Sequence, residues 1–399
     1  GALPYIYSGA IPVPLDAIFE TMSGFTTTGS TILTEIETLP KSLLFWRSLT
    51  HWLGGMGIIV LSLAILPMLG VGGMQLFKAE VPGPTADRLR PRIQDTAKLL
   101  WGVYLLLTAV ETLLLMLGGM NFFDAVCHSF ATLATGGFST KNASIAAYDS
   151  SYIDGVITLF MILAGINFTL HFHLLRGKLR DFHNNEELRC YLGLIVAATA
   201  IIVGFNWYHD TYQQLGENFR YSIFQVASII TTTGFGTADY EGWTILPQYI
   251  LVMLMFVGGC AGSTGGGMKV ARILLLLKHA QVQVFRLIHP RAIRLVKLGN
   301  RPVDKEVLQS ILGFFALFIG TFVFASLLMA ACGMDLVSGG AAVIACLANI
   351  GPGLGSVGPV DNFAHIPAFG KSVLIICMLM GRLELFTVLV LFFPSFWRK

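Results

Sequence analysis

The chain has 399 residues, of which 54% are hydrophobic and only 12% are charged, with a net charge of +3 and a mean hydropathy of +0.70. A water-soluble globular protein of this length exposes far more charge, so that class is excluded. Long apolar runs recur at about the ~20 residues that a helix needs to cross a bilayer. The composition therefore predicts an integral membrane protein.

Long apolar segments alternate with short ones along the chain. We expect a spanning helix over 42–69, then an outer helix, a short helix and an inner helix over 96–120, 123–133 and 152–176. The next set covers 187–208, 219–230 and 245–287, and the last covers 303–332, 336–348 and 367–394. The short helices cannot cross a bilayer. They are stable at membrane depth only if they are re-entrant and buried in protein or line a wet cavity.

A Thr/Gly-rich turn occurs four times, each before a long hydrophobic segment. The turns read TTTGST at 26–31, ATGGFST at 134–140, TTTGFGT at 231–237 and NIGPGLG at 349–355. Each begins 10 to 14 residues after a polar or acidic residue: Asp16, Asp124, Tyr221 or Asp335. Glycine permits backbone angles that turn successive carbonyls toward an axis, and threonine adds hydroxyls without bulk. A role as a simple turn explains one such loop easily and four poorly, so we expect an ion filter.

These turns divide the chain into four repeats, over 1–75, 76–180, 181–300 and 301–399. The predicted fold is all-α, with four pseudo-symmetric helix–pore loop–helix repeats around one central pore, as in potassium channels. The first repeat has no outer helix, because residues 1–14 are too few to span and contain prolines. We expect that an upstream segment is missing.

The predicted inner helix 245–287 is interrupted by six glycines within ten residues. At ~1 kcal/mol each, they cannot remain helical. A break inside the membrane is viable where it lines a water-filled path, and the alternative is a packing seam of small residues between helices. The residues concerned are Gly258, Gly259, Gly262, Ser263, Thr264, Gly265, Gly266 and Gly267. A phosphate-binding loop is excluded, because Lys269 is not followed by Ser or Thr.

Arg382 lies in the last predicted span. A charge at that depth faces a cavity or a partner, and the alternative to a role in the ion path is a structural ion pair with Glu384 or Glu111. We expect Arg47 and His51 to be structural and to lie near a membrane face.

The histidines and cysteines give weaker indications of function. His171 and His173 lack carboxylate or cysteine partners, so we expect no metal site there. The six cysteines are scattered and are expected to act as small hydrophobic residues. We found no catalytic constellation at matching depths on the spans.

Most of the 26 Lys and Arg residues lie on the side away from the turns. The positive-inside rule then places the turns outside and the basic loops in the cytoplasm. One basic stretch between two spans is expected either to anchor lipid headgroups or to dock a cytosolic subunit. It contains Arg286, Arg291, Arg294, Lys297 and Arg301.

Six motifs resemble the TrkH/KtrB/HKT superfamily of potassium transporters, and its TrkH family most closely. They are SGFTTTGST at 23–31, LATGGFST at 133–140, TTTGFGTADYEGW at 231–243, GGCAGSTGGGMK at 258–269, NIGPGLGSVGP at 349–359 and MGRLELFTVL at 380–389. The resemblance covers the whole chain. The chain departs from the family in lacking its N-terminal helices, and its fourth filter begins with Asn349 instead of threonine.

The resemblance implies a K⁺ selectivity filter whose four glycines are Gly29, Gly137, Gly234 and Gly351. In this superfamily, glycine at all four positions goes with potassium, and serine at the first goes with sodium. The second turn offers both Gly136 and Gly137, and we choose Gly137 because GGFST then aligns with TGFGT of the third turn. The remaining filter residues are Thr27, Thr28, Thr135, Thr232, Thr233, Asn349 and Ile350.

The resemblance further implies K⁺ uptake across the bacterial inner membrane, with the glycine-rich loop and Arg382 forming an intramembrane gate. The implied partners are a cytosolic nucleotide-binding ring (TrkA-like), membrane lipid and a second copy of the chain. We expect no organic cofactor in this chain and no nucleic-acid partner. A K⁺ symporter coupled to Na⁺ or H⁺ is the alternative function, and an intramembrane enzyme is a remote one.

Overall fold

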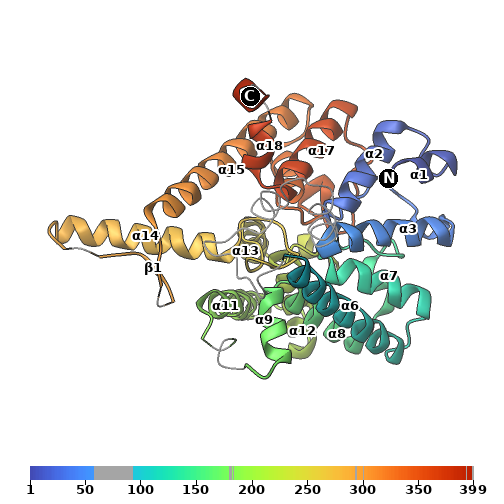
Figure 1. Cartoon of the computed structure of the whole chain (residues 1–399). Coiled ribbons are helices and arrows are strands. Elements are labelled where there is room, and N and C mark those ends of the chain that lie inside the picture. The colour runs from blue at the N-terminus through green and yellow to red at the C-terminus, as the bar shows by residue number, and fades with distance from the viewer. Residues whose placement is uncertain are drawn as a thin grey trace.

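Short and long helices alternate in the computed structural model, which describes residues 1–57, 93–178, 182, 184–292, 294–299, 301–391 and 393–397. Besides loops and turns, the described chain consists of helices and one two-stranded antiparallel hairpin, β1 (Lys297–Leu298) and β2 (Arg301–Pro302) (Figure 1). The long helices are α6 (Ile93–Leu117), α11 (Glu186–Tyr208) and α15 (Lys305–Ala331). Within the described ranges these three are long and apolar enough to cross a membrane.

Four short helices precede the four Thr/Gly turns. They are α2 (Pro14–Phe25), α7 (Phe122–Leu133), α12 (Leu215–Ile230) and α16 (Leu336–Leu347). Their starts carry ordinary helix signals: Pro14 occupies the first turn of α2, and the Asn121 and Asp335 side chains cap α7 and α16. The predicted start of α12 at residue 219 was four residues late.

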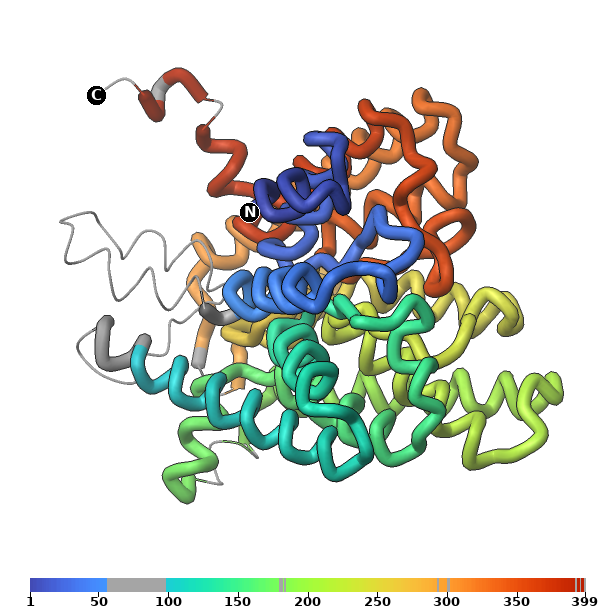
Figure 2. The backbone as a smooth tube through the Cα atoms, turned by 90° about the vertical axis from the view of Figure 1, so that its right-hand side faces the viewer, coloured from blue at the N-terminus to red at the C-terminus, as the bar shows by residue number. Residues whose placement is uncertain are grey.

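Shorter helices complete the bundle. They are α1 (Leu3–Tyr7), α3 (Lys41–Trp52), α8 (Ser151–Ala164), α9 (Phe168–Leu175), α13 (Ile245–Met255), α14 (Val270–Ile288), α17 (Ala368–Arg382), α18 (Leu385–Val390) and α19 (Pro394–Trp397). The arm formed by α14 projects from the body, and α18 and α19 lead the chain away from it (Figures 1 and 2). The predicted span 42–69 is described only as far as residue 57, where α3 continues into a π-turn, Leu53–Gly57.

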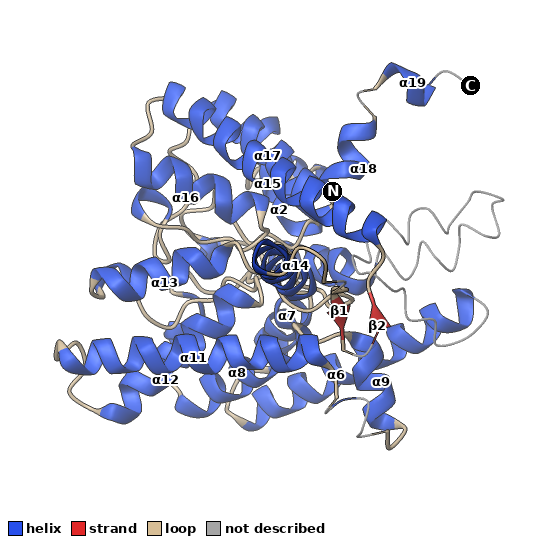
Figure 3. Cartoon of the chain, turned by 90° about the vertical axis from the view of Figure 1, so that its left-hand side faces the viewer, coloured by secondary structure: helices blue, strands red, loops and turns tan. Residues whose placement is uncertain are grey.

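The short helices pack in a cyclic order. Each contacts the helix that follows its own turn: α3 for α2, α8 for α7, α13 for α12 and α17 for α16. Each also contacts the corresponding helix of the preceding set: α7 packs on α3, α12 on α8 and α16 on α13. The order closes because α2, near the start of the chain, packs on α17 of the last set (Figure 3).

Two predicted inner helices are not continuous. The predicted helix 152–176 is two helices, α8 and α9, bent by 102°. Asn167 caps the second of them, and the Gly165 carbonyl accepts a hydrogen bond from the Cys260 backbone N–H at 2.8 Å. The predicted helix 367–394 ends at Arg382, because Glu384 has a φ of 60° that no α-helix can hold. In both places a polar contact or a strained residue interrupts an apolar run, which hydropathy alone cannot reveal.

The bend at Gly165 gives a stability test. A Cβ at Gly165 would lie 2.4 Å from the Tyr191 hydroxyl and 3.1 Å from Thr231 Cγ2. Gly165→Ala should therefore destabilise the fold by about 1–3 kcal/mol through overpacking, which thermal unfolding of the detergent-solubilised protein would detect. Adding Tyr191→Phe removes the closest atom and should restore part of the loss.

Gly155 is the matched control. It lies in the same region of the chain, on the exposed side of α8, and a Cβ there meets nothing within 4 Å. Gly155→Ala should leave the melting temperature unchanged or raise it. Equal losses in Gly165→Ala and Gly155→Ala would contradict the packing account.

Candidate functional site

The four turns share one backbone conformation. A non-glycine residue with positive φ opens each, at Thr27, Thr135, Thr232 and Asn349, with φ of 53°, 53°, 61° and 55°. Two residues later each has a glycine with positive φ, at Gly29, Gly137, Gly234 and Gly351, with φ of 86°, 76°, 80° and 105°. Positive φ is uncommon outside glycine and costs about 1–3 kcal/mol when a non-glycine residue is held there. The repeated pattern supports the register that pairs Gly137, and not Gly136, with the other three glycines.

The four glycines close a ring through their neighbours' carbonyls. A Cβ on Gly29 would lie 2.2 Å from the carbonyl oxygen of Gly136, and one on Gly137 would lie 2.0 Å from that of Thr233. A Cβ on Gly234 would lie 1.9 Å from the Ile350 oxygen, and one on Gly351 would lie 2.8 Å from the Thr28 oxygen. Each glycine therefore packs against the residue that precedes the glycine of the next turn. Any side chain at these positions would displace a carbonyl of the ring.

The threonines beside the ring are fully buried and bonded to one another. Thr28 Oγ1 lies 2.7 Å from Thr26 Oγ1, and Thr233 Oγ1 lies 2.8 Å from Thr231 Oγ1. In the fourth turn the Asn349 amide donates to Thr28 Oγ1 at 3.0 Å and to the Met378 carbonyl at 3.0 Å. The asparagine thus links the fourth turn to the first and to α17. Thr135 donates to the Ala134 carbonyl at 2.6 Å.

The glycine-rich segment between α13 and α14 is a non-helical loop. Its two ends are held together by a hydrogen bond from the Gly258 N–H to the Met268 carbonyl (2.8 Å) and one from the Val270 N–H to the Gly259 carbonyl (3.2 Å). The loop is mostly buried, and Lys269 donates to the Gly265 carbonyl. A Cβ on Gly258 would lie 2.0 Å from the Gly266 oxygen, so the loop folds tightly on itself.

This loop reaches the carboxyl ends of three short helices. Thr264 Oγ1 donates to the Leu133 carbonyl at the end of α7 (2.9 Å), and a Cβ on Gly265 would lie 3.1 Å from the Thr231 oxygen after α12. A Cβ on Gly266 would lie 2.3 Å from the Ala348 oxygen after α16. The Gly266 N–H also donates to Thr232 Oγ1 at 2.6 Å, which ties the loop directly to the third turn. Of the remaining loop residues, Gly262 accepts from the Phe168 N–H, and Ser263 and Gly267 lie beside Arg382.

Arg382 joins the loop to the first repeat. Its guanidinium donates to the Thr264 carbonyl at 2.7 Å and to the Gly54 and Gly55 carbonyls at 2.8 and 3.1 Å. Helix carboxyl ends carry partial negative charge, so a cation is stabilised where several of them gather. Arg382 lines a cavity of about 20 Å³ with the loop. The Thr264 hydroxyl takes no part in this contact, because it donates to the Leu133 and Ala164 carbonyls instead.

Three weaker candidates, Glu384, Arg47 and His51, have partners in distant parts of the chain. Glu384 forms an ion pair with Arg272 of α14, a partner that the sequence did not suggest. Arg47 and His51 are 2% and 0% exposed, and both stack on Phe138, next to Gly137. The contact of both side chains with Phe138 could not be predicted from the sequence, because Phe138 lies on a loop far along the chain.

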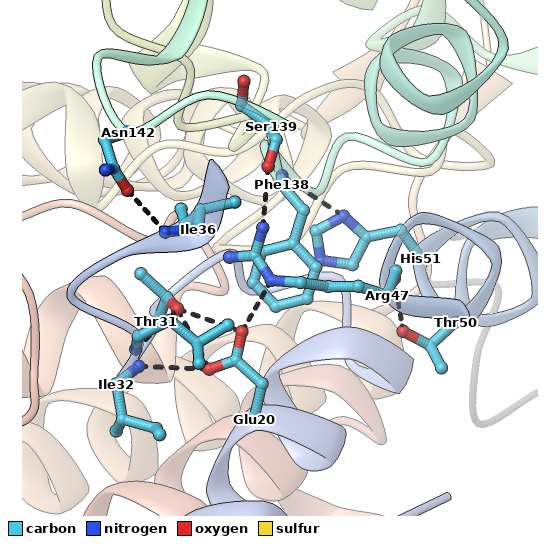
Figure 4. A network of polar contacts seen from close by, with 11 residues as sticks. Glu20, Thr31, Ile32, Ile36, Arg47, Thr50, His51, Phe138, Ser139 and Asn142 are labelled. Carbon is cyan, nitrogen blue, oxygen red and sulfur yellow. Dashed lines mark hydrogen bonds and ion pairs between the residues drawn. The ribbon is translucent and has the colours of Figure 1, made fainter. Parts of the chain in front are cut away.

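Glu20 was missed entirely. It is fully buried on α2, forms an ion pair with Arg47 and accepts hydrogen bonds from Thr31 and Ile32 at the end of the first turn (Figure 4). The available signal was its position, nine residues before Gly29. His128 and Gln225 stand nine residues before Gly137 and Gly234 and are also buried polar residues.

Comparison with known proteins points to one family. A family model described as TrkH, cation transport protein, matches residues 2–399. The chain is 47% identical to the Trk system potassium uptake protein TrkH of Escherichia coli K12, over all of this chain and 83% of that protein. It is 37% identical to the E. coli protein TrkG, over 96% of this chain and 79% of that protein. The crystal structure of the potassium transporter TrkH from Vibrio parahaemolyticus superposes with a TM-score of 0.86 at 41% identity, covering 97% of this chain and 80% of that one.

Proposed function

The chain belongs to the TrkH family of cation transport proteins, and from this premise we propose that it is a multi-pass membrane protein that takes up K⁺ across the bacterial cytoplasmic membrane. The relatives named as potassium uptake proteins support K⁺ as the transported ion. Transport, and not enzyme catalysis, is the activity of this family.

The observation that carries the proposal is the closed ring of carbonyls at Thr28, Gly136, Thr233 and Ile350. An ion filter replaces the hydration shell of K⁺ with backbone oxygens, and such oxygens must be held at close range without side chains between them. The cyclic packing of α2, α7, α12 and α16 supports four helix–pore loop–helix repeats around this ring.

We propose that K⁺ enters from an outer cavity and leaves past the glycine-rich loop. A cavity of about 70 Å³ is lined by the four ring glycines and by loop residues beyond them, including Asp361. The basic side faces the cytoplasm by the positive-inside rule. Inward movement is then favoured by the membrane potential, at ~2.3 kcal/mol per charge per 100 mV.

A symporter coupled to Na⁺ or H⁺ is the second candidate, because a ring of carbonyls serves either mechanism. Flux of K⁺ or Rb⁺ into proteoliposomes at a set potential separates the two. A channel-like pore conducts without a second gradient, and its reversal potential follows K⁺ alone. A symporter shows a fixed coupling ratio and a reversal potential that moves with the Na⁺ or H⁺ gradient.

The filter assignment is tested by serine substitution. In Gly234→Ser the added Cβ would lie 1.9 Å from the Ile350 carbonyl oxygen, so this oxygen must move and the ring must open. We expect the ratio of K⁺ to Na⁺ uptake to fall by about tenfold or more, as for loss of ~1.4 kcal/mol of discrimination. Gly29→Ser should act in the same direction.

Gly236 is the control for this test. It lies two residues beyond Gly234, and a Cβ there meets only the Pro359 oxygen at 3.9 Å. Gly236→Ser should keep the parent's ratio. Unchanged ratios in both Gly234→Ser and Gly29→Ser would remove the filter assignment.

We propose that the glycine-rich loop and Arg382 gate the path. The loop lies against three helix carboxyl ends and bonds to Thr232, and Arg382 adds a fixed positive charge beside it. A guanidinium repels K⁺, and it is always charged. In this state the loop and the cation together obstruct the route below the ring.

Arg382→Ala should therefore raise K⁺ flux several-fold and reduce its dependence on a cytosolic partner. Deleting two glycines within 265–267 should act likewise. K⁺ flux is measured for both variants on purified protein that elutes at the parent's position in gel filtration. Lys371 lies on the same helix as Arg382 and pairs with Asp16 of α2. Lys371→Ala breaks this ion pair and should not raise flux. If both gate variants fold yet conduct no more than the parent, the loop and Arg382 are structural.

The cytosolic partner is proposed to dock on the basic segment between α14 and the β1–β2 hairpin. Arg291 and Arg294 are exposed there, and Arg294 packs over the Phe285 ring at 5.0 Å. Anchoring of lipid headgroups is the alternative role for this stretch. We further propose that the protein forms a homodimer, as the resemblance to its family implies.

Reversing both charges, Arg291→Glu with Arg294→Glu, should weaken pull-down of a TrkA-like nucleotide-binding subunit by about tenfold or more, because rim charges steer association. Lys41→Glu, an exposed charge on the filter side, should leave it intact. Intact binding in the double variant, with reduced binding to anionic vesicles, would favour the lipid role.

A further inference from the structure

A buried ion pair lies beside the cavity that the ring glycines line (Figure 4). Glu20 on α2 is 0% exposed and Arg47 on α3 is 2% exposed, and Arg47 Nε lies 2.7 Å from Glu20 Oε1. Burying two charges carries a desolvation cost that their attraction alone rarely repays. A pair in this position is therefore expected to do more than join α2 to α3.

Each partner also holds the outer part of a filter turn. The Glu20 carboxylate accepts from the Thr31 hydroxyl and the Ile32 N–H, both at 3.0 Å, two and three residues beyond Gly29. Arg47 Nη1 donates to the Ser139 carbonyl at 2.8 Å, two residues beyond Gly137. The guanidinium also stacks on the Phe138 ring at 3.6 Å. The ion pair thus connects the first turn to the second.

The pair adjoins the route of the ion. Arg47 lines the outer cavity of about 70 Å³ together with all four ring glycines. Its charge is permanent, so an uncompensated guanidinium there would repel an entering cation. Glu20 supplies the opposite charge at contact distance, which leaves this part of the mouth electrically neutral.

The other turns are held by single side chains, two of which are carboxylates: Asp124 Oδ1 accepts from the Thr140 hydroxyl at 2.8 Å in the second turn, and Glu241 accepts from the Gly355 N–H in the fourth. The remaining ones are neutral. His128 Nε2 lies 2.9 Å from Ser139 Oγ in the second turn, and Gln225 donates to the Ala238 carbonyl at 3.1 Å beyond the third. In the fourth, the Tyr240 hydroxyl donates to the Gly353 carbonyl at 2.7 Å. Among the described residues, the Glu20–Arg47 pair is the buried ion pair that connects one turn to another.

We propose that Glu20 and Arg47 are positioning residues for ion selectivity: they set the spacing of the first two turns and keep the outer mouth neutral. This inference rests on the filter function proposed above. The carboxylate and the guanidinium perform separate tasks, because charge balance needs both charges, whereas the bridge to Ser139 and Phe138 needs the planar, multiply donating guanidinium.

Three variants separate these tasks in proteoliposome flux assays of the full chain. Glu20→Gln leaves the Arg47 charge uncompensated and should lower K⁺ flux by at least about tenfold, since a charge in a partly dehydrated site is weakly screened. Arg47→Lys keeps the charge but loses the planar bridge, so flux should stay within about threefold of the parent while the K⁺/Na⁺ ratio falls. The double variant Glu20→Gln/Arg47→Gln should recover flux over Glu20→Gln without recovering the ratio.

A second ion pair provides the matched control. Arg220 Nε lies 2.7 Å from Asp154 Oδ2, the same separation, and joins α12 to α8 away from the ring cavity. Arg220→Lys should change neither flux nor ratio beyond its effect on protein yield. Thermal unfolding and gel filtration of each variant show whether the purified protein is folded.

The outcomes decide between the accounts. If Gly234→Ser lowers the ratio but folded Arg47→Lys keeps that of the parent, the pair is structural and the inference fails. If Gly234→Ser also leaves the ratio unchanged, the filter itself is misassigned. Should Glu20→Gln fail to fold, the ratio of Arg47→Lys, set against Arg220→Lys, decides alone.

Discussion

The close approach of four glycines to four carbonyls is the constraint on which the rest of the structure depends. Each ring glycine leaves no room for a Cβ, with the nearest oxygen 1.9 to 2.8 Å from where that atom would lie. Such contacts require that the surrounding helices hold the four turns close together. The cyclic packing of the short helices does this. The buried threonine hydroxyls and the Glu20–Arg47 pair fix the turns at their two ends.

The same geometry explains why a polar, non-helical loop is stable inside a membrane protein. The short helices end at the turns, so their terminal carbonyls lack partners within the helix. The loop supplies the Thr264 hydroxyl to one of these carbonyls, and small residues let it approach the others. Arg382 adds donors for the Gly54 and Gly55 carbonyls, where the π-turn after α3 leaves the helix. Loop, arginine and helix ends therefore satisfy one another.

Much of this could be predicted from local sequence, and the failures have a common cause. The four turns and three of the four short helices, α7, α12 and α16, follow from the local sequence, and the glycine-rich break follows from helix propensity. The bend after α8, the break at Glu384 and the Glu20–Arg47 pair were not predicted. Each depends on a partner far along the chain, such as Cys260 for Gly165, Arg272 for Glu384 and Ser139 for Arg47. A single sequence shows the periodicity of its hydrophobic residues, but it does not show which distant residues contact one another.

The central claim is that the carbonyls of Thr28, Gly136, Thr233 and Ile350 bind the transported ion. Anomalous diffraction from crystals grown in Rb⁺ or Tl⁺, both K⁺ substitutes, tests it most directly. The account predicts a peak enclosed by these four oxygens, absent when Na⁺ replaces the heavier ion. Well-ordered turns with no peak at the ring, and ions bound only elsewhere, would contradict it.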